Sequence, residues 1–569
     1  MLKNVSQRGP KRLRSSIDGE AQHSPTRETR VTHSGRRAFA LAAALVQTSL
    51  FSGCDTQDAA VKQVDPAAAE RPPNIVFVFA DDLGIGDLSV YGGEVINTPN
   101  IDQLAATGVR FTQGYMTHAV CSPSRAGLLT GRYQQRHGWE FNPAGRDVEN
   151  GMSLDERTMA DVLKADGYAT GLIGKWHLGY GAIGEALRSA ANEPLERYEV
   201  AGLNPGAQQD DHHPLARGFD EYFGVLAGGS NYIDPAVPGV EYVAIGPTRH
   251  PRPARIAVFR GREIVEVEDY LTDVFTDEAV AFIDRHRDEP FFLYLSHTTP
   301  HTPLQATAKY LDRYRHIDNK AKRIYSAMVA SLDDSVGAVV EKLRAIGQLD
   351  NTLIVFSSDN GCMGGNYRLT EGMCSNAPHA GYKRYHQEGG IRVPLIMNWP
   401  AALPAGTVYE QPVISLDLLA TFSAAAGQGT TTEDSVNLLP YLTGEMDGAP
   451  HEYLYWRAGP TIAIRDERWK LIRYNKPSLS KADLRDDGRL QPPPEGWGTD
   501  SPDGQLTLLF DLTSDPGETE NLAAEHPAIV TRLEQAHADW AAGLADTPIL
   551  PAVRSTLVDI HGATVQLFF

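Results

Sequence analysis

Three uninterrupted apolar runs constrain the fold of this chain more than any other feature. They occupy residues 74–80, 291–295 and 352–356. An apolar run without polar alternation is typical of a strand buried on both faces, as in the parallel sheets of α/β proteins. Between the runs, six apolar residues from Ile324 to Leu343 recur every three or four positions, which is helical spacing. The alternation predicts an α/β fold with a large, mainly parallel sheet flanked by helices.

Acidic and amide side chains follow two of these runs. Asp81 and Asp82 come directly after the first run, and Asp359 and Asn360 come shortly after the third. Open α/β sheets bind ligands at the carboxyl ends of their strands. Carboxylate and amide oxygens suit Ca²⁺ or Mg²⁺, whereas no Cys/His cluster in the sequence indicates zinc. Either pair taken alone is better explained as turn or capping residues. Both pairs at strand ends are candidate ligands of a hard cation, which the motif around Cys121 described below favours.

The pattern changes after about residue 426. Residues 463–472 are typical of a hairpin, residues 508–512 of a strand, and residues 527–544 of an amphipathic helix that begins with a proline. We therefore predict a large α/β domain over residues 74–426 and a smaller α+β domain over residues 427–545, built from an antiparallel sheet and one helix. The tail, residues 546–569, is expected either to pack on the large domain or to mediate self-association.

Residues 1–54 are interpreted as an export signal, followed by a linker over residues 55–73. Arg36 and Arg37 precede a stretch of about sixteen residues without a charge, which resembles a twin-arginine signal. The residues that end at Cys54 resemble a lipobox, in which Cys54 would carry a lipid anchor. The alternative is an N-terminal transmembrane anchor, for which the stretch is short. A periplasmic or cell-surface location is expected.

The formal net charge of −20 restricts the partners of the chain. Nucleic acid is not expected, because its binding requires a basic surface. An anionic substrate requires a site that is locally positive, formed by a metal ion and converging cations.

The most specific motif surrounds Cys121. Residues 121–125 read Cys-Ser-Pro-Ser-Arg, and residues 126–132 read Ala-Gly-Leu-Leu-Thr-Gly-Arg. This series resembles the maturation signature of the type I, formylglycine-dependent sulfatases of the alkaline phosphatase-like superfamily. The resemblance implies that a formylglycine-generating maturase oxidises Cys121 and that the aldehyde hydrate is the nucleophile. The alternative for the motif alone is a buried structural cysteine in a loop broken by proline.

The resemblance extends to other motifs in the expected order. Residues 174–179 read Gly-Lys-Trp-His-Leu-Gly, residues 300–303 read Pro-His-Thr-Pro, and Lys383 stands five residues before Glu388. By resemblance, one calcium ion per chain is bound by Asp81, Asp82, Asp359 and Asn360. The catalytic residues implied are Cys121, Arg125, His177 and His301, with His301 as general acid and Arg125 as support for the metal carboxylates. The sulfate-binding residues implied are Lys175 and Lys383, and Ser230 is a looser substrate contact whose alternative is an ordinary glycine-rich loop.

These features predict hydrolysis of sulfate monoesters on a sulfated polysaccharide or oligosaccharide. Two alternatives remain: a phosphonate or phosphodiester hydrolase of the same superfamily, and a non-catalytic lipoprotein that binds sulfated glycans. Cys362 and Cys374 form either one disulfide or two buried thiols. His212, His213 and His386 are better explained as exposed loop histidines than as the lining of a sugar pocket.

Overall fold

The computed structural model describes residues 71–143, 151–179, 211–243, 258–364, 372–475, 504–545 and 555–568. All of these residues belong to one compact unit that begins at Val64. The expected export signal, with Cys54, lies outside the described residues. Among the described residues, no helix is both long and apolar enough to cross a membrane.

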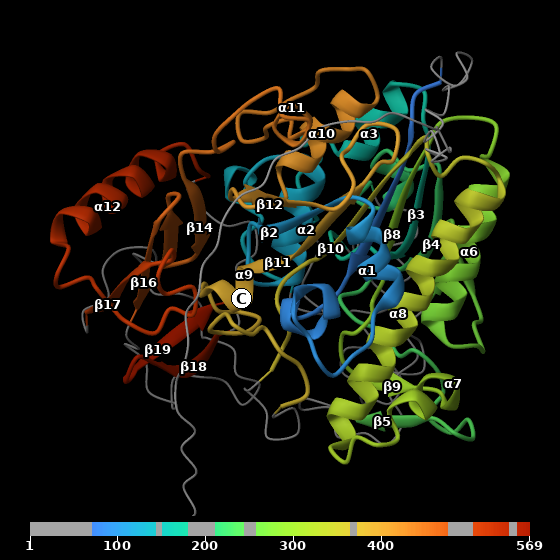
Figure 1. The fold of residues 1–569 in the computed structure, drawn as a ribbon, viewed down its shortest axis with the longest axis horizontal. Coiled ribbons are helices and arrows are strands. Elements are labelled where there is room, and N and C mark those ends of the chain that lie inside the picture. Colours follow the sequence, from blue (N-terminus) through green and yellow to red (C-terminus); the bar gives the residue numbers. More distant parts are fainter. Residues whose placement is uncertain are drawn as a thin grey trace, which may run out of the picture. The chain divides into compact units, whose positions relative to one another are not determined.

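An eleven-stranded sheet forms the larger part of the described fold (Figure 1). Its order is β12 (Thr407–Tyr409), β2 (Val109–Tyr115), β11 (Arg392–Asn398), β10 (Thr352–Ser358), β1 (Asn74–Ala80), β8 (Phe291–Ser296), β3 (Ala169–Lys175), β4 (Glu221–Val225), β6 (Val258–Arg260) and β7 (Glu263–Val265), with β13 (Val413–Ile414) beside β2. The central strands β10, β1, β8, β3 and β4 pair in parallel, whereas β11, β6 and β7 pair antiparallel to their neighbours. The predicted mainly parallel sheet is confirmed.

Helices cover both faces of this sheet. Successive residues of a strand point to opposite faces, so each buried strand contributes side chains to two cores. Phe77 and Phe79 of β1 lie in one core, and Val76 and Val78 lie in the other. The first core is completed by α2 (Cys121–Thr130), α3 (Met159–Ala165), α10 (Asp417–Ala425) and α11 (Leu439–Leu442). The second is completed by α1 (Pro99–Ala106), α6 (Leu271–Arg285), α7 (Ala308–Leu311) and α8 (Lys320–Ala345).

Shorter elements lie between these strands and helices in the sequence. They are α9 (Glu388–Ile391), the strand pair β5 (Glu241–Val243) and β9 (Leu304–Ala306), and the 3-10 helices η2 (Ile85–Asp87), η3 (Ser89–Tyr91), η4 (Gln134–His137), η6 (Pro214–Ala216) and η7 (Asp312–Tyr314).

A separate antiparallel sheet follows in the sequence. It consists of β14 (Leu454–Ala458), β15 (Thr461–Arg465), β16 (Trp469–Asn475) and β17 (Gln505–Asp511), in that order. The helix α12 (Pro527–Ala541) packs on it through Leu533, which is buried against Ile464 and Leu509. The predicted antiparallel sheet with one helix is present; the domain boundaries at residues 427 and 545 stay predictions.

The C-terminal tail contains a hairpin. Its strands are β18 (Ser555–Ile560) and β19 (Ala563–Phe568). Val565 and Leu567 of this hairpin are buried in one cluster with Phe510 of β17. The tail therefore packs against the smaller sheet, where a short two-stranded unit gains the apolar face that it lacks alone.

Candidate functional site

Neighbouring parallel strands end at the same edge of the large sheet, and the candidate site lies there. Asp81 and Asp82 follow β1, and Asp359 and Asn360 follow β10, its partner strand. Lys175 is the last residue of β3. The loops are tied together, because the Asp359 N–H donates to the Ala80 carbonyl at 3.2 Å. The position agrees with the ligand-binding edge of open α/β sheets.

Cys121 is the first residue of α2, whose residues are all buried. Pro123 fits there because the amides of a first helical turn have no partner within the helix. The helix N-terminus directs partial positive charge toward residue 121. The loop expected in the alternative interpretation is not observed, since the motif folds as a helix, although Cys121 is buried as that interpretation expects.

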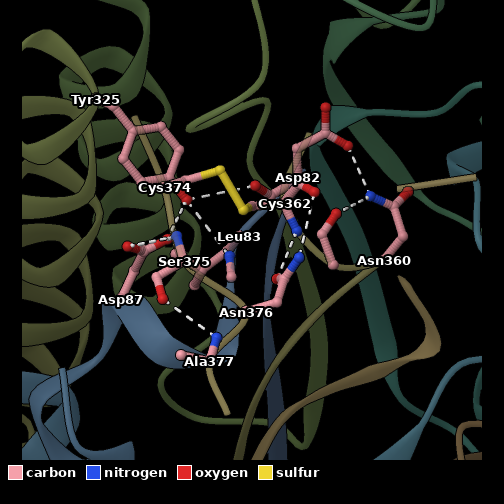
Figure 2. Close-up of a disulfide and its surroundings, with 12 residues drawn as sticks. Asp82, Leu83, Asp87, Tyr325, Asn360, Cys362, Cys374, Ser375, Asn376 and Ala377 are labelled. Atoms are coloured by element: carbon pink, nitrogen blue, oxygen red, sulfur yellow. Dashed lines mark hydrogen bonds between the residues drawn. A yellow bond between two sulfur atoms is a disulfide. The ribbon is translucent and has the colours of Figure 1, made fainter. Parts of the chain in front are cut away.

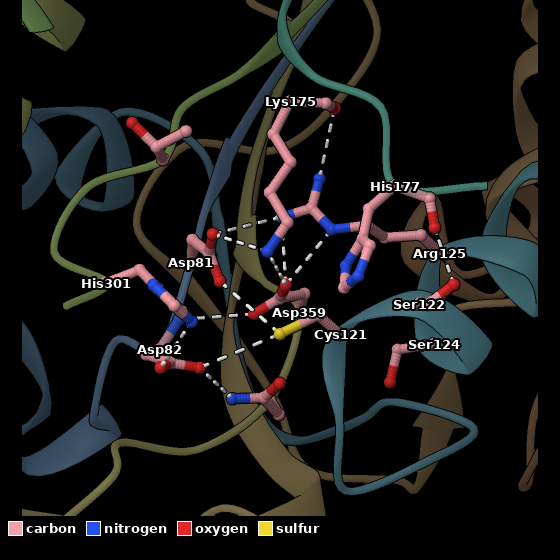
Figure 3. A network of polar contacts seen from close by, with 12 residues as sticks. Asp81, Asp82, Cys121, Ser122, Ser124, Arg125, Lys175, His177, His301 and Asp359 are labelled. Atoms are coloured by element: carbon pink, nitrogen blue, oxygen red, sulfur yellow. Dashed lines mark hydrogen bonds and ion pairs between the residues drawn. The ribbon is translucent and has the colours of Figure 1, made fainter. Parts of the chain in front are cut away.

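Acidic and basic groups surround the Cys121 sulfur (Figure 3). The Sγ atom lies 3.6 Å from Asp81 Oδ1 and 4.0 Å from Asp82 Oδ1. The Lys383 ammonium lies 2.9 Å from it. Burial raises the pKa of the thiol to about 12, and Asp359 adds to the effect. The unmodified side chain is therefore a protonated thiol.

Two oxygens of the acidic loops suit a hard cation. Asp82 Oδ2 and Asn360 Oδ1 are buried, and neither has a hydrogen-bond partner within the described part of the chain. The other carboxylate oxygen, Asp82 Oδ1, accepts a hydrogen bond from Asn360 Nδ2 at 2.7 Å. Buried polar atoms without partners are costly. Carboxylate and amide oxygens of this kind are ligands that calcium prefers, so the residues present fit the implied ion.

Three buried cations face the three carboxylates. Lys175 Nζ lies 2.7 Å from Asp81 Oδ2, and Lys383 Nζ lies 2.5 Å from Asp82 Oδ1. Burial and then Asp359 raise the pKa of Asp81 to about 7. Burial opposes ionisation of Asp359 as well, but Arg125 and both lysines together hold its pKa below the usual range.

Arg125 has no exposed surface and is buried against the metal-site carboxylate of Asp359. Its Nε and Nη2 atoms donate to Asp359 Oδ2 at 3.1 and 2.8 Å. Its Nη1 atom donates to Ser296 Oγ at 2.5 Å, and the guanidinium lies 5.0 Å from the centre of the Phe79 ring. This geometry matches a supporting position rather than a substrate contact.

The two predicted catalytic histidines come from different strands. His177 follows β3 with a φ of 64°, and its carbonyl accepts a hydrogen bond from Ser122 Oγ at 2.5 Å. His301 follows β8; its Nδ1 contacts the Thr302 carbonyl at 2.6 Å, and its Nε2 lies 3.6 Å from Asp82 Oδ2. A carbonyl partner fixes the Nδ1–H tautomer in neutral His301. Burial lowers the pKa of both imidazoles, Lys175 adds to this at His177, and Asp82 opposes it at His301.

A glycine-rich loop packs against both histidines. A Cβ atom on Gly228 would lie 2.5 Å from His177 Nε2, and one on Gly229 would lie 3.1 Å from the His301 ring. Ser230 is buried, and its hydroxyl donates to the Asn231 carbonyl at 3.0 Å. This loop therefore lines the site beside the two histidines, but the Ser230 hydroxyl is engaged by the carbonyl of the next residue.

Several supporting residues were not predicted from the sequence. Ser296 links Arg125 to β8, and Ser122 Oγ accepts a hydrogen bond from Trp139 Nε1 at 2.8 Å. A lone serine carries no signal that distinguishes such a position. The glycine pair at residues 228 and 229 can be read in the sequence, but many loops contain such pairs, so it does not identify a loop that lines a site.

Two other sequence interpretations, of three histidines and of two cysteines, can be compared with the structure. His213 and His386 are each 1% exposed, so the expectation of exposed loop histidines is wrong for both. His212 is partly exposed. Cys362 and Cys374 form a disulfide, which decides between the two alternatives left open above (Figure 2).

Comparisons with known proteins agree on one family. A family model described as Sulfatase matches residues 73–428. Steryl-sulfatase of Mus musculus is 31% identical over 546 residues, covering 81% of this chain and 80% of that protein. N-acetylgalactosamine-6-O-sulfatase of Bacteroides thetaiotaomicron is 29% identical over 535 residues, covering 86% of this chain and 96% of that protein.

Solved structures give the same result. The crystal structure of Ps i-CgsB in complex with k-i-k-neocarrahexaose has a TM-score of 0.66 and 31% identity, covering 84% of this chain and 95% of that chain. The phosphonate monoester hydrolase of Agrobacterium radiobacter has a TM-score of 0.54 at 19% identity, covering 87% and 99%, a likeness of fold alone.

Proposed function

We propose that this chain, which belongs to the sulfatase family, hydrolyses sulfate monoesters on a polysaccharide or oligosaccharide. It is a type I member of the alkaline phosphatase-like superfamily and a sulfuric ester hydrolase. Two similar proteins support a carbohydrate substrate. One relative is named for N-acetylgalactosamine 6-O-sulfate chemistry, and one solved neighbour binds a neocarrahexaose.

The observation that carries the proposal is the set of charges around residue 121. The carboxylates of Asp81, Asp82 and Asp359 are balanced by three buried cations. A divalent ion held by residues of the acidic loops would add positive charge to this balanced set. An anionic ester would then be attracted to this edge of the sheet although the chain carries a net charge of −20.

Calcium and a formylglycine made from Cys121 complete the proposed site. The ion would be held by Asp81, Asp82, Asp359 and Asn360, and would supply Lewis-acid polarisation of a sulfate oxygen. The formylglycine would supply a hydrated aldehyde hydroxyl as the nucleophile. A maturase that oxidises the thiol is required, and the burial of Cys121 at 1% exposure favours its action before folding.

The residues of the chain have separate tasks in this proposal. Lys175 and Lys383 bind and orient the sulfate group, a preorganised arrangement that stabilises the charge of the transferring group. Arg125 holds Asp359 in place. Burial lowers the pKa of the His301 imidazole, and an anion bound nearby would raise it, which would prepare a proton for the leaving alcohol. His177 is placed to hold a proton beside residue 121.

A direct comparison of esters tests the proposed reaction. The matured protein is assayed on the sulfate monoester, the phosphonate monoester and the phosphodiester of one alcohol, with a Cys121→Ala variant as control. We expect the sulfate ester to be hydrolysed fastest and the control to be inactive. Faster turnover of the phosphonate or phosphodiester would favour the alternative hydrolase, and full turnover by Cys121→Ala would exclude the proposed nucleophile.

We also propose that the protein acts outside the cytoplasm, in the periplasm or at the cell surface, with Cys54 as a lipid anchor. The Cys362–Cys374 disulfide supports this location, because structural disulfides persist in oxidising compartments. Fractionation of cells that express the full chain, with a Cys54→Ala variant as the unanchored control, tests it. Recovery of both proteins in the cytoplasm would contradict the proposal.

A further inference from the structure

The disulfide lies close to the predicted metal ligand Asn360 (Figure 2). Cys362 follows Asn360 by two residues and has no exposed surface, whereas Cys374 is partly exposed. The two Cα atoms are 6.3 Å apart. A bond at Cys362 therefore restrains the backbone that immediately follows Asn360, and links it to a residue that is only partly buried.

The backbone of Cys362 also anchors the segment that carries Lys383. The Lys383 N–H donates to the Cys362 carbonyl at 3.0 Å. The Asn376 amide bridges the same two segments: its Oδ1 accepts from the Cys362 N–H at 3.0 Å, and its Nδ2 donates to the Gly381 carbonyl at 3.1 Å. One short piece of chain thus holds a metal ligand on one side and a sulfate-binding lysine on the other.

The residues after Cys374 are packed on the turn that carries Asp82. The Ser375 N–H donates to both oxygens of Asp87 at 3.0 Å. A Cβ atom on Gly84 would lie 2.2 Å from the Ser375 carbonyl oxygen, so the two backbones are in direct contact. The disulfide therefore joins the Asn360 loop to a segment that is already fixed to the Asp82 turn.

We propose that the Cys362–Cys374 disulfide is a positioning device, which places Asn360 and Lys383 and completes the metal- and sulfate-binding parts of the site only in the oxidised protein. The inference rests on the proposed function of that site. Neither cysteine touches the substrate; both act through the backbone of their neighbours.

The redox chemistry of the device is ordinary thiol–disulfide exchange. Two thiols lose two electrons and two protons and form the S–S bond, while a low-molecular-weight disulfide such as oxidised glutathione takes them up and leaves as two thiols. Cys374, being partly exposed, is the sulfur that such a reagent reaches first. Activation would then accompany transfer of the protein to an oxidising compartment.

A serine variant tests the device with two probes. We compare the native protein with Cys362→Ser/Cys374→Ser by calorimetric titration with Ca²⁺ alone, and by inhibition of the matured enzyme with inorganic sulfate. Groups that orient metal ligands change affinity by about 10–100-fold when removed. We expect calcium and sulfate each to bind at least about tenfold more weakly to the variant, and Asn376→Ala, which keeps the disulfide, to share the loss.

The control is Leu533→Ala, which removes a buried side chain of α12 in the smaller sheet's cluster. It lowers the melting temperature but should leave both affinities unchanged. An equal loss of calcium affinity in Leu533→Ala, or a serine variant within twofold of the native protein, would overturn the inference. Calcium affinity that depends on the disulfide in a protein without sulfatase activity would support the device and refute the proposed function.

Native protein provides a second test if the serine variant does not fold. A phosphine reductant opens the disulfide, and intact mass confirms that two hydrogens have been gained. Calcium affinity should fall on reduction and return when oxidised glutathione restores the bond. Affinity that is unchanged by reduction would again overturn the inference.

Discussion

Replacing Arg125 by methionine is expected to destabilise the protein strongly. Methionine keeps an unbranched side chain but is shorter than arginine and has no donor. The substitution removes two charge-assisted hydrogen bonds to Asp359, at 2.8 and 3.1 Å, from a position without exposed surface. Removing one partner of a buried ion pair costs about 3–5 kcal/mol, because the other charge stays buried. We therefore expect Arg125→Met to lower the free energy of unfolding by about 3–5 kcal/mol.

Urea unfolding in the presence of a chelator, followed by tryptophan fluorescence, measures this loss. In Arg125→Met/Asp359→Asn both charges are absent, so the double variant should lose less than the sum of the single losses, with a coupling of about 0.5–3 kcal/mol. Saturating calcium should reduce the loss in Arg125→Met, because the ion offsets the unpaired carboxylate. A loss below about 1 kcal/mol, or strictly additive variants, would refute the reasoning.

Three further perturbations have defined outcomes. Burial lowers the pKa of His451, but the Asp417 carboxylate at 2.8 Å outweighs burial, and the pKa is raised. The stability that this pair contributes is present below a pH of about 6.5 and is lost as pH rises through the raised pKa. His451→Gln should therefore flatten the dependence of the urea midpoint on pH between about 6 and 8. Leu567→Ala in the tail hairpin removes a side chain that is 1% exposed and should cost about 2–5 kcal/mol in urea unfolding; no change would mean that the hairpin does not pack in solution. Chelation of calcium should abolish turnover and lower the melting temperature, and calcium at about 100 times its dissociation constant should restore about 2.7 kcal/mol of stability; an active, unshifted protein in chelator would exclude the metal site.

The sequence predicted the elements whose residues are buried on both faces. The strand over residues 74–80 was placed with its correct bounds, because all seven residues are buried and the apolar run is continuous. The strand Val109–Tyr115 was not found, since Arg110, Thr112 and Gln113 interrupt its apolar pattern. The helix expected over residues 527–544 ends at Ala541, a boundary that the apolar spacing does not determine.

The candidate site was predictable where chemistry and position coincide. Asp81 and Asp359 follow strands that pair in parallel, so their proximity follows from the topology. The sequence left the Cys362–Cys374 bond as one of two alternatives, because pairing depends on the distance and direction of the two side chains. The burial of His386 was missed since a single histidine in a loop carries no periodic signal.

The central claim is that residue 121, once oxidised, hydrolyses sulfate esters. The most direct measurement uses preparations expressed with graded amounts of maturase. In each preparation, mass spectrometry gives the fraction of the residue-121 peptide that carries an aldehyde in place of the thiol. This fraction is compared with the amount of sulfate released from a sulfated oligosaccharide. Sulfate release should rise in proportion to the converted fraction and be zero without conversion. Sulfate release by protein in which Cys121 is wholly unmodified would contradict it.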